Sequence, residues 1–126
     1  MQISKLHQVG AGARDLDETI RFYRDTLGAR LMGRFDSPGL VFFDLAGTRL
    51  LFEKGPANAT LYFRVDDIDA AHRELAAKGV AFDSAPHRIH RDDAGQFGPA
   101  GAEEWMAFFK DPSGNTLALA SQRLPR

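Results

Sequence analysis

The sequence contains no cysteine among its 126 residues, which excludes disulfides, thiolate metal sites and a cysteine nucleophile. Its formal net charge is only −1 and its acids and bases are interspersed, so it offers no basic stripe for phosphate-backbone contacts. The opening residues, MQISKLHQVG, lack an apolar run long enough for a signal peptide or a membrane helix. We therefore expect a cytoplasmic protein that binds neither nucleic acid nor membrane.

The composition is that of one soluble globular domain. Hydrophobic residues make up 44% of the chain and charged residues 26%, which is typical of folded soluble proteins. A length of 126 residues is enough to bury a sizeable core and is short for two independent domains. We expect residues 1–126 to form a single domain.

An internal repeat organises that domain. Residues 13–17 (ARDLD) precede one helical pattern, and residues 65–69 (VDDID) precede another. The downstream halves also correspond. Residues 42–51 (FFDLAGTRLL) match residues 108–118 (FFKDPSGNTLA), with one extra residue in the second turn. The chain is therefore read as two copies of one unit.

Each copy predicts a strand, a helix and three further strands. Asp15 can N-cap the first helix, with Glu18 completing a capping box, and Gly28 falls where a left-handed C-terminal cap is needed. One such unit leaves a sheet face uncovered on the side away from its helix, so two units can curve into a shared cup. We predict an α+β fold of two tandem βαβββ modules, residues 1–55 and 57–122, whose curved mixed sheet or partial barrel surrounds a cup-shaped pocket.

Two segments resemble a known family. Residues 9–28, with the motifs RDLD and FYRDTLG, and residues 109–115 (FKDPSGN) resemble the vicinal-oxygen-chelate superfamily of glyoxalases, bleomycin-resistance proteins and extradiol dioxygenases. The resemblance covers nearly the whole chain at matching spacing in both copies. It implies a single glyoxalase-like domain that binds a small molecule in its cup, and often a homodimer. The family contains enzymes and non-catalytic drug-binding proteins, so the fold does not decide whether this chain is an enzyme.

Enzymes of this superfamily hold a divalent metal with His, Glu or Gln from four strand positions. The resemblance places these positions on Gln8, Leu51, Thr60 and Ala118. Of the four, Gln8 alone offers a usable donor, its neutral carbonyl oxygen, whereas a first-row metal needs three or four N, O or S donors. His7 does not replace it, because a shift of one residue would turn the core side of the strand outward. We therefore expect no metal and no cofactor.

The same register predicts which side chains face the cup and contact a small organic ligand. The predicted ligand-binding residues are Gln8, Arg49, Leu51 and Glu53 in the first copy and Thr60, Tyr62, Arg64 and Ala118 in the second, with Trp105 in an aromatic wall. The arginines suit a carboxylate or phosphate, because the guanidinium binds such groups bidentately, or they pair internally with the glutamate. Gly10 and Gly12 either leave volume in the cup or accommodate sheet curvature.

Residues 84–103 have no counterpart of that length in the first copy, and we expect a long loop that can close over the cup. Its His87 and His90 can act as general acid or base, and with Glu104 they can form a metal site outside the family pattern, although solvated loop histidines are more common. Three functions remain open. They are metal-independent binding of an aromatic or anionic ligand, a glyoxalase- or epimerase-like lyase or isomerase using His87, His90 and Glu104, and a regulatory module without small-molecule chemistry.

Overall fold

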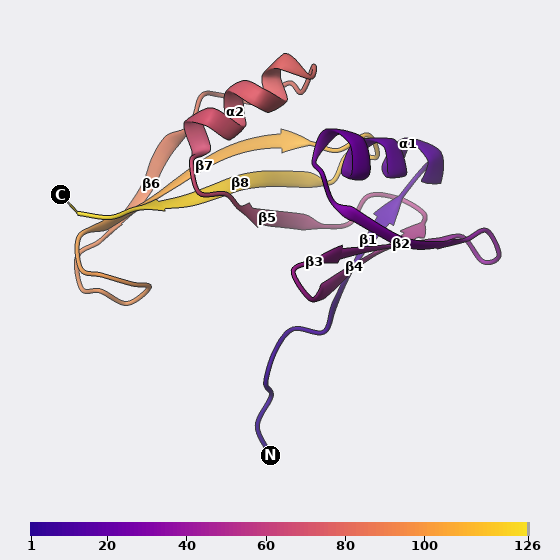
Figure 1. The fold of residues 1–126 in the computed structure, drawn as a ribbon, viewed down its shortest axis with the longest axis horizontal. Coiled ribbons are helices and arrows are strands. Elements are labelled where there is room, and N and C mark those ends of the chain that lie inside the picture. The colour runs from indigo at the N-terminus through magenta and orange to yellow at the C-terminus, as the bar shows by residue number, and fades with distance from the viewer. Residues whose placement is uncertain (126) are drawn as a thin grey trace. The chain divides into compact units, whose positions relative to one another are not determined.

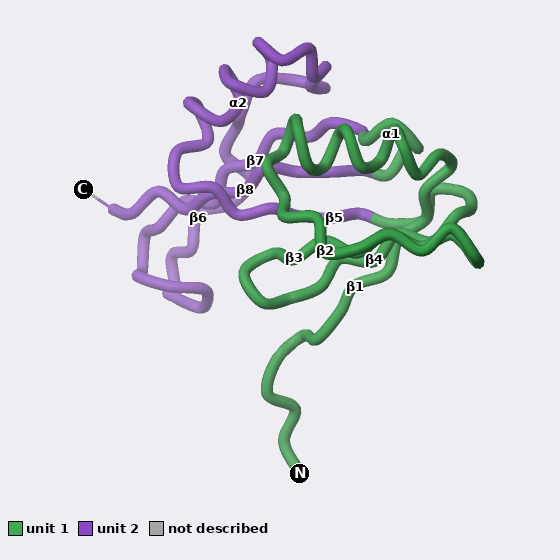
Figure 2. Tube along the Cα trace, turned by 45° about the vertical axis from the view of Figure 1, so that its right-hand side comes forward, with its two compact units in different colours: residues 1–59, 111–115 green, residues 60–110, 116–126 purple. Residues whose placement is uncertain are grey.

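The computed structural model describes residues 1–125 as two compact units (Figure 2). The first unit comprises residues 1–59 together with 111–115, and the second comprises residues 60–110 with the chain from residue 116 on. Each unit has one four-stranded sheet with helical segments on one face (Figure 1). The two-module βαβββ architecture predicted from the repeat is confirmed, while the turn at 111–115 groups with the first unit.

The first unit has the strand order β1-β4-β3-β2. β1 runs parallel to β4, and the other two pairs are antiparallel. A short α-helix continues directly into a π-helical turn. The elements are β1 (Gln8–Ala13), α1 (Leu16–Ile20), η1 (Arg21–Thr26), β2 (Arg30–Phe35), β3 (Leu40–Leu45) and β4 (Thr48–Lys54).

The helical segment of this unit begins at the predicted N-cap Asp15 and ends at the predicted Gly28. The Asp15 carboxylate accepts a hydrogen bond of 3.0 Å from the backbone N–H of Glu18. Gly28 adopts a φ of +77° just after the last turn, a conformation that glycine enters without penalty. Between these ends the ring of Tyr23 packs against Phe43 and Phe52, at centroid distances of 5.6 and 4.5 Å. These contacts form the core of the unit.

The turn at 111–115 contributes a buried polar network to the first unit. Asp111 is only 6% exposed, and its carboxylate accepts hydrogen bonds from the backbone N–H groups of Ser113 and Asn115. The amide of Asn115 in turn donates to the backbone oxygen of Gly12 at 2.7 Å. The turn is therefore locked by its own aspartate and bonded to β1.

The second unit has the strand order β5-β8-β7-β6, with β5 parallel to β8. The Asp67 carboxylate caps its helix by accepting from the N–H of Ala70, and Gly79 ends the helix with a φ of +94°. Ile68 and Leu75 are buried where the helix packs on β7 and β8. The elements are β5 (Thr60–Arg64), α2 (Ile68–Ala77), β6 (His87–Asp92), β7 (Ala102–Lys110) and β8 (Thr116–Arg123).

The expectation of an irregular loop across residues 84–103 is wrong for its first half. β6 (His87–Asp92) pairs antiparallel with β7, with a register shift between Arg88 and His90. Its sequence, HRIHRD, does not look like a strand because almost every side chain of this edge strand is polar and exposed. The true insertion is the loop 93–101, which joins β6 to β7.

Residues 1–125 contain no helix that is both long and apolar enough to span a lipid bilayer.

Candidate functional site

In the first unit, one sheet face lies away from the helical segments. Ala11, Leu50 and Phe52 are buried on the helix side, and strand side chains alternate between faces. The intervening residues of paired β1 and β4 therefore share the open face. They are Gln8, Gly10 and Gly12 in β1, paired with Arg49, Leu51 and Glu53 in β4. The sequence predicted these residues to be together, and the register brings them together.

The two glycines of β1 have different roles. A Cβ added to Gly10 would meet no atom within 4 Å, so the space beside it is open. A Cβ on Gly12 would lie 1.8 Å from the backbone oxygen of Pro56. Gly12 therefore allows another backbone segment to approach β1 closely, and it leaves no volume for a ligand at this position.

Arg49 is already partly engaged in the first unit. Its Nη2 donates to Nε2 of His7 at 2.7 Å, while its Nε is buried without a hydrogen-bond partner within residues 1–125. The predicted alternative of an ion pair between Arg49 and Glu53 is absent from the described part of the chain. His7 precedes β1 and its ring contacts Arg49 of β4.

In the second unit, the open face of the sheet carries most of the predicted residues. Ala107, Phe109 and Leu117 are fully buried on the helix side, so the alternate positions face the other way. Cross-strand pairing places His90 opposite Glu104 and Glu104 opposite Gln122. The same face carries Thr60, Tyr62 and Arg64 in β5, Ala118 and Ala120 in β8, Met106 in β7 and His87 in β6.

Trp105 lies on the opposite face from the other predicted ligand contacts of this unit. It pairs with Arg88 and Ser121 across the strands. Because it directly follows Glu104 in β7, its side chain points to the opposite face of the sheet. The Arg123 guanidinium stacks 3.8 Å from the centre of its ring, and its indole N–H donates to Glu103 at 3.0 Å. Trp105 therefore has structural partners of its own.

A cavity of about 490 Å³ opens on the face that carries Glu104. It is lined by His90, Phe97, Glu104 and Gln122, from β6, the 93–101 loop, β7 and β8. No hydrogen bond or ion pair within residues 1–125 engages the side chains of His90, Glu104 or Gln122. Three polar groups with free hydrogen-bonding capacity thus converge beside an exposed aromatic ring.

Asp92 at the end of β6 holds the 93–101 loop in shape. Its buried carboxylate accepts hydrogen bonds of 2.8 Å from the backbone N–H groups of both Gln96 and Phe97. These N–H groups, that of Phe97 foremost, hold the pKa of Asp92 below its usual value. The loop presents Phe97 with its side chain 71% exposed, at a ring-centre distance of 6.3 Å from His90.

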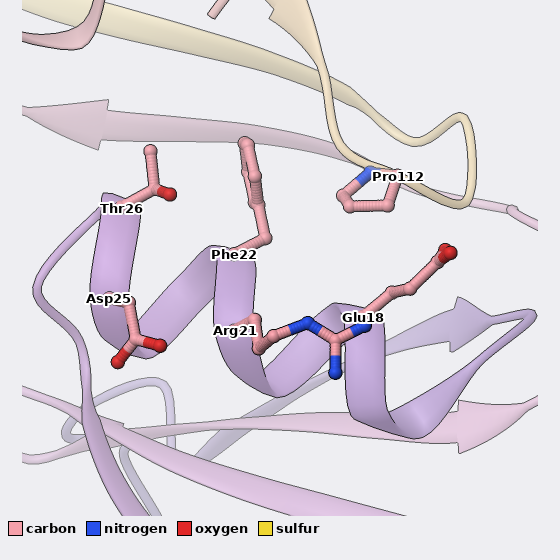
Figure 3. Close-up of a pocket in the computed structure, with 6 residues that line it drawn as sticks. All are labelled: Glu18, Arg21, Phe22, Asp25, Thr26 and Pro112. Atoms are coloured by element: carbon pink, nitrogen blue, oxygen red, sulfur yellow. The ribbon is translucent and has the colours of Figure 1, made fainter. Parts of the chain in front are cut away.

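A second cavity, of about 410 Å³, lies in the first unit on the outer side of α1 and η1 (Figure 3). The rings of Phe22 and Pro112 stand on one side of the helical segment, and Asp25 at its other side is paired with Arg24. Its lining residues are Glu18, Arg21, Phe22, Asp25, Thr26 and Pro112. The sequence did not predict it, because one of its lining residues, Pro112, comes from the turn at 111–115, far from the helical segment in the sequence.

Comparison with known proteins identifies the family. The Glyoxalase/Bleomycin resistance protein/Dioxygenase superfamily matches residues 5–119 of the chain. The chain belongs to this superfamily.

Solved structures of other proteins share the fold at low sequence identity. Lactoylglutathione lyase from Agrobacterium tumefaciens superposes with a TM-score of 0.72 at 22% identity, with 96% of each chain covered. Virulence protein STM3117 from Salmonella typhimurium superposes with a TM-score of 0.77 at 19% identity, with 96% of this chain and 98% of that protein covered. The protein YraH of Bacillus subtilis is 23% identical to this chain over an alignment of 136 residues including gaps, and the alignment covers 91% of this chain and 96% of YraH.

The superfamily's metal positions can now be tested against the donor chemistry of each unit. In the first unit, Gln8 pairs with Arg49 in β4. The side-chain oxygen of Gln8 therefore lies beside a strand that carries a positive charge, which disfavours a cation there. Leu51 and Ala118 have no donor atom, and Thr60 offers only a neutral hydroxyl. No group of three or more His, Asp or Glu side chains within residues 1–125 is arranged to hold a metal. The residues present do not fit the superfamily's metal.

Two features of the second-unit cavity were missed by sequence reasoning. Phe97 and Gln122 were not singled out, although His90 and Glu104 were. Gln122 follows from Glu104 by cross-strand register, but that register requires knowing that β6 exists. The sequence contains one signal for Phe97, which is an aromatic residue in a glycine-rich segment that follows two aspartates. Aspartates are common where a turn begins, and Asp92 does hold this loop.

Proposed function

We propose that this protein binds a small aromatic organic molecule without using a metal ion. The observation that carries the proposal is the side-chain chemistry at the superfamily's four metal positions, Gln8, Leu51, Thr60 and Ala118. Three of them lack any effective donor. A member of the superfamily that keeps the fold but has no metal ligands retains the family's capacity for binding while losing its usual Lewis acid.

The ligand site we propose is the second-unit cavity. Its volume of about 490 Å³ suits a drug-sized or smaller organic molecule. Phe97 and His90 supply ring surfaces on which a flat molecule can stack, and Glu104 and Gln122 supply orienting polar groups. An anionic ligand is less well supported, because Arg49 already donates to His7 and Arg64 is solvent-exposed.

Two measurements test this proposal. Elemental analysis of untagged protein should find zinc, nickel, manganese and iron far below one ion per chain, whereas a stoichiometric metal would refute the metal-independent mode. A thermal-shift screen of aromatic compounds in the presence of EDTA should find stabilising ligands, since a ligand at 100 times its Kd adds about 2.7 kcal/mol. A complete absence of stabilising compounds would favour a regulatory module.

A second candidate function rests on the pairing of His90 with Glu104. These residues are cross-strand neighbours on one face, an arrangement that can serve proton transfer at a carbon next to a carbonyl, as in an isomerase or epimerase. His87 fits less well, because its Nδ1 lies 3.3 Å from the backbone oxygen of Ala85. If this activity exists, the protein in D2O will exchange the α-proton of an α-hydroxy ketone, and His90→Ala will abolish the exchange.

A further inference from the structure

We propose that the second-unit cavity selects an aromatic ligand that carries a positive charge, with Glu104 as its counter-ion. The inference rests on the proposed function and names the chemical class of the ligand. It follows from how charges are distributed between the two faces of the β6-β7-β8 sheet.

Arginines from these strands share the face opposite to the cavity. Arg88 pairs across the strands with Trp105, and both Arg91 and Arg123 pair with Glu103. Trp105 and Glu103 are the neighbours of Glu104 in β7, so their side chains and those of the paired arginines lie on the face opposite to that of Glu104. Each arginine is neutralised there by an acid. The ion pairs are Arg88 with Glu103 at 3.1 Å, Arg91 with Asp93 at 3.0 Å and Arg123 with Asp69 at 2.6 Å.

The cavity face has the reverse arrangement. Glu104 is half-buried, lines the cavity and forms no ion pair or hydrogen bond within residues 1–125. Arg64 also faces this side, but it lies in β5, separated from β7 by β8, and does not pair with Glu104. The neighbouring Asp92 adds a second negative charge at the end of β6. Among the four residues that line the cavity, Glu104 is the acidic one and no Lys or Arg is present, so the fixed charge of the lining is negative.

The aromatic wall suits the same kind of ligand. The exposed ring of Phe97 stands nearly perpendicular to His90, with an interplanar angle of 87°. The face of a phenylalanine ring attracts cations, and a carboxylate strengthens hydrogen bonds from an ammonium donor. The amide oxygen of Gln122 can accept a further N–H group. An arylalkyl ammonium or an amidinium with an aromatic ring can engage the ring of Phe97 and the carboxylate of Glu104 together, whereas an aromatic carboxylate would face Glu104 with like charge.

A matched set of three ligands tests this inference in the full chain. The ligands are 2-naphthylmethylamine, 2-naphthalenemethanol and 2-naphthoic acid, titrated calorimetrically at neutral pH in the presence of EDTA. We expect the amine to bind roughly tenfold more tightly than the alcohol, and the acid most weakly. The affinity of the amine should fall with added salt while that of the alcohol stays constant.

Two glutamates that are adjacent in sequence provide a matched pair of variants. Glu104→Gln should reduce the preference for the amine over the alcohol by roughly tenfold. Glu103→Gln removes the same charge from the opposite face of β7 and should leave the preference unchanged. The wild-type ligand ranking and its salt dependence test the inference even if one variant folds poorly.

The outcomes separate this inference from the proposed function. If the alcohol or the acid binds as tightly as the amine, or Glu104→Gln leaves the ranking unchanged in a folded protein, the cation preference is refuted and aromatic binding stands. If none of the three ligands perturbs the backbone amide resonances of Phe97, Glu104 or Gln122, both proposals fail.

Discussion

The hydroxyl of Tyr23 donates a 2.8 Å hydrogen bond to Oδ2 of Asp111, joining residues 88 positions apart in the sequence. Both side chains are buried, at 1% and 6% exposure. Burial and the carboxylate of Asp111 raise the pKa of Tyr23 above its usual value, so the hydroxyl is a donor at neutral pH. The bond connects the helical segment of the first unit to the turn at 111–115.

Tyr23→Phe should destabilise the protein because it leaves a buried carboxylate oxygen with one donor fewer. We expect a loss of about 1.5–3 kcal/mol in the free energy of unfolding, measured by urea denaturation. The control is Tyr62→Phe, since Tyr62 is 58% exposed and its substitution should cost less than about 0.5 kcal/mol. Equal effects of the two substitutions would contradict a structural role for the Tyr23 hydroxyl.

The two glycines of β1 should respond oppositely to alanine. Gly12→Ala places a Cβ 1.8 Å from the Pro56 backbone oxygen, and relieving this overlap should cost about 3 kcal/mol or more. Gly10→Ala meets open space and should change stability by less than about 1 kcal/mol, in the stabilising direction if at all. The denaturation midpoints of the two variants, compared with that of the wild-type protein, test this prediction. If Gly12→Ala is as stable as the wild type, Pro56 does not lie as close to Gly12 as the structure shows.

The loop that carries Phe97 should loosen in acid. The pKa of Asp92 is lowered in the folded protein, so its stabilising contribution is complete above the usual aspartate value of about 4 and is lost as the pH falls through the lowered pKa. Asp92→Asn should mimic this loss at neutral pH, because its amide offers one acceptor oxygen for two backbone donors. We expect faster hydrogen exchange at the amides of Gln96 and Phe97.

The matched control for that experiment is Asp93→Asn, because Asp93 is exposed and pairs with Arg91 on the surface. Its substitution should leave the exchange rates of both loop amides unchanged. If Asp92→Asn also leaves them unchanged, the loop is held by something other than the Asp92 carboxylate.

Phe97 should contribute to ligand affinity without contributing to stability. Its side chain is 71% exposed, so Phe97→Ala should shift the free energy of unfolding by less than about 0.5 kcal/mol. Loss of its stacking surface should weaken an aromatic ligand by roughly tenfold in calorimetric titration. Phe35→Ala removes another exposed ring, in the first unit, and should leave the affinity unchanged.

Much of the fold was predictable because local signals agreed with the repeat. Asp15 and Gly28 mark the ends of the first helical segment by hydrogen-bonding and dihedral preferences that act over a few residues. The register of β1 and β4 followed from alternating apolar residues, since an error of one position would expose the core. These features depend on short-range chemistry, which a single sequence displays.

The candidate site was less predictable because it depends on an edge strand without an apolar pattern. The sequence names His90 as a member of the 84–103 loop and Glu104 as a residue just after it, and only the pairing of β6 with β7 places them on one face. Trp105 looked like a wall of the cup, yet it lies on the far face beside Arg123. For Gly12 the sequence left open volume and sheet curvature as alternatives, and the structure places the backbone oxygen of Pro56 in that space. Each of these depends on long-range packing that sequence patterns do not record.

The most direct test of metal-independent binding in the second unit is an amide chemical-shift map of the 15N-labelled protein with 2-naphthylmethylamine in excess EDTA. The account predicts saturable shifts at His90, Phe97, Glu104 and Gln122, with an affinity that does not change when EDTA is replaced by zinc. Binding that appears only with added metal, or shifts confined to Gln8 and Leu51 in the first unit, would contradict it.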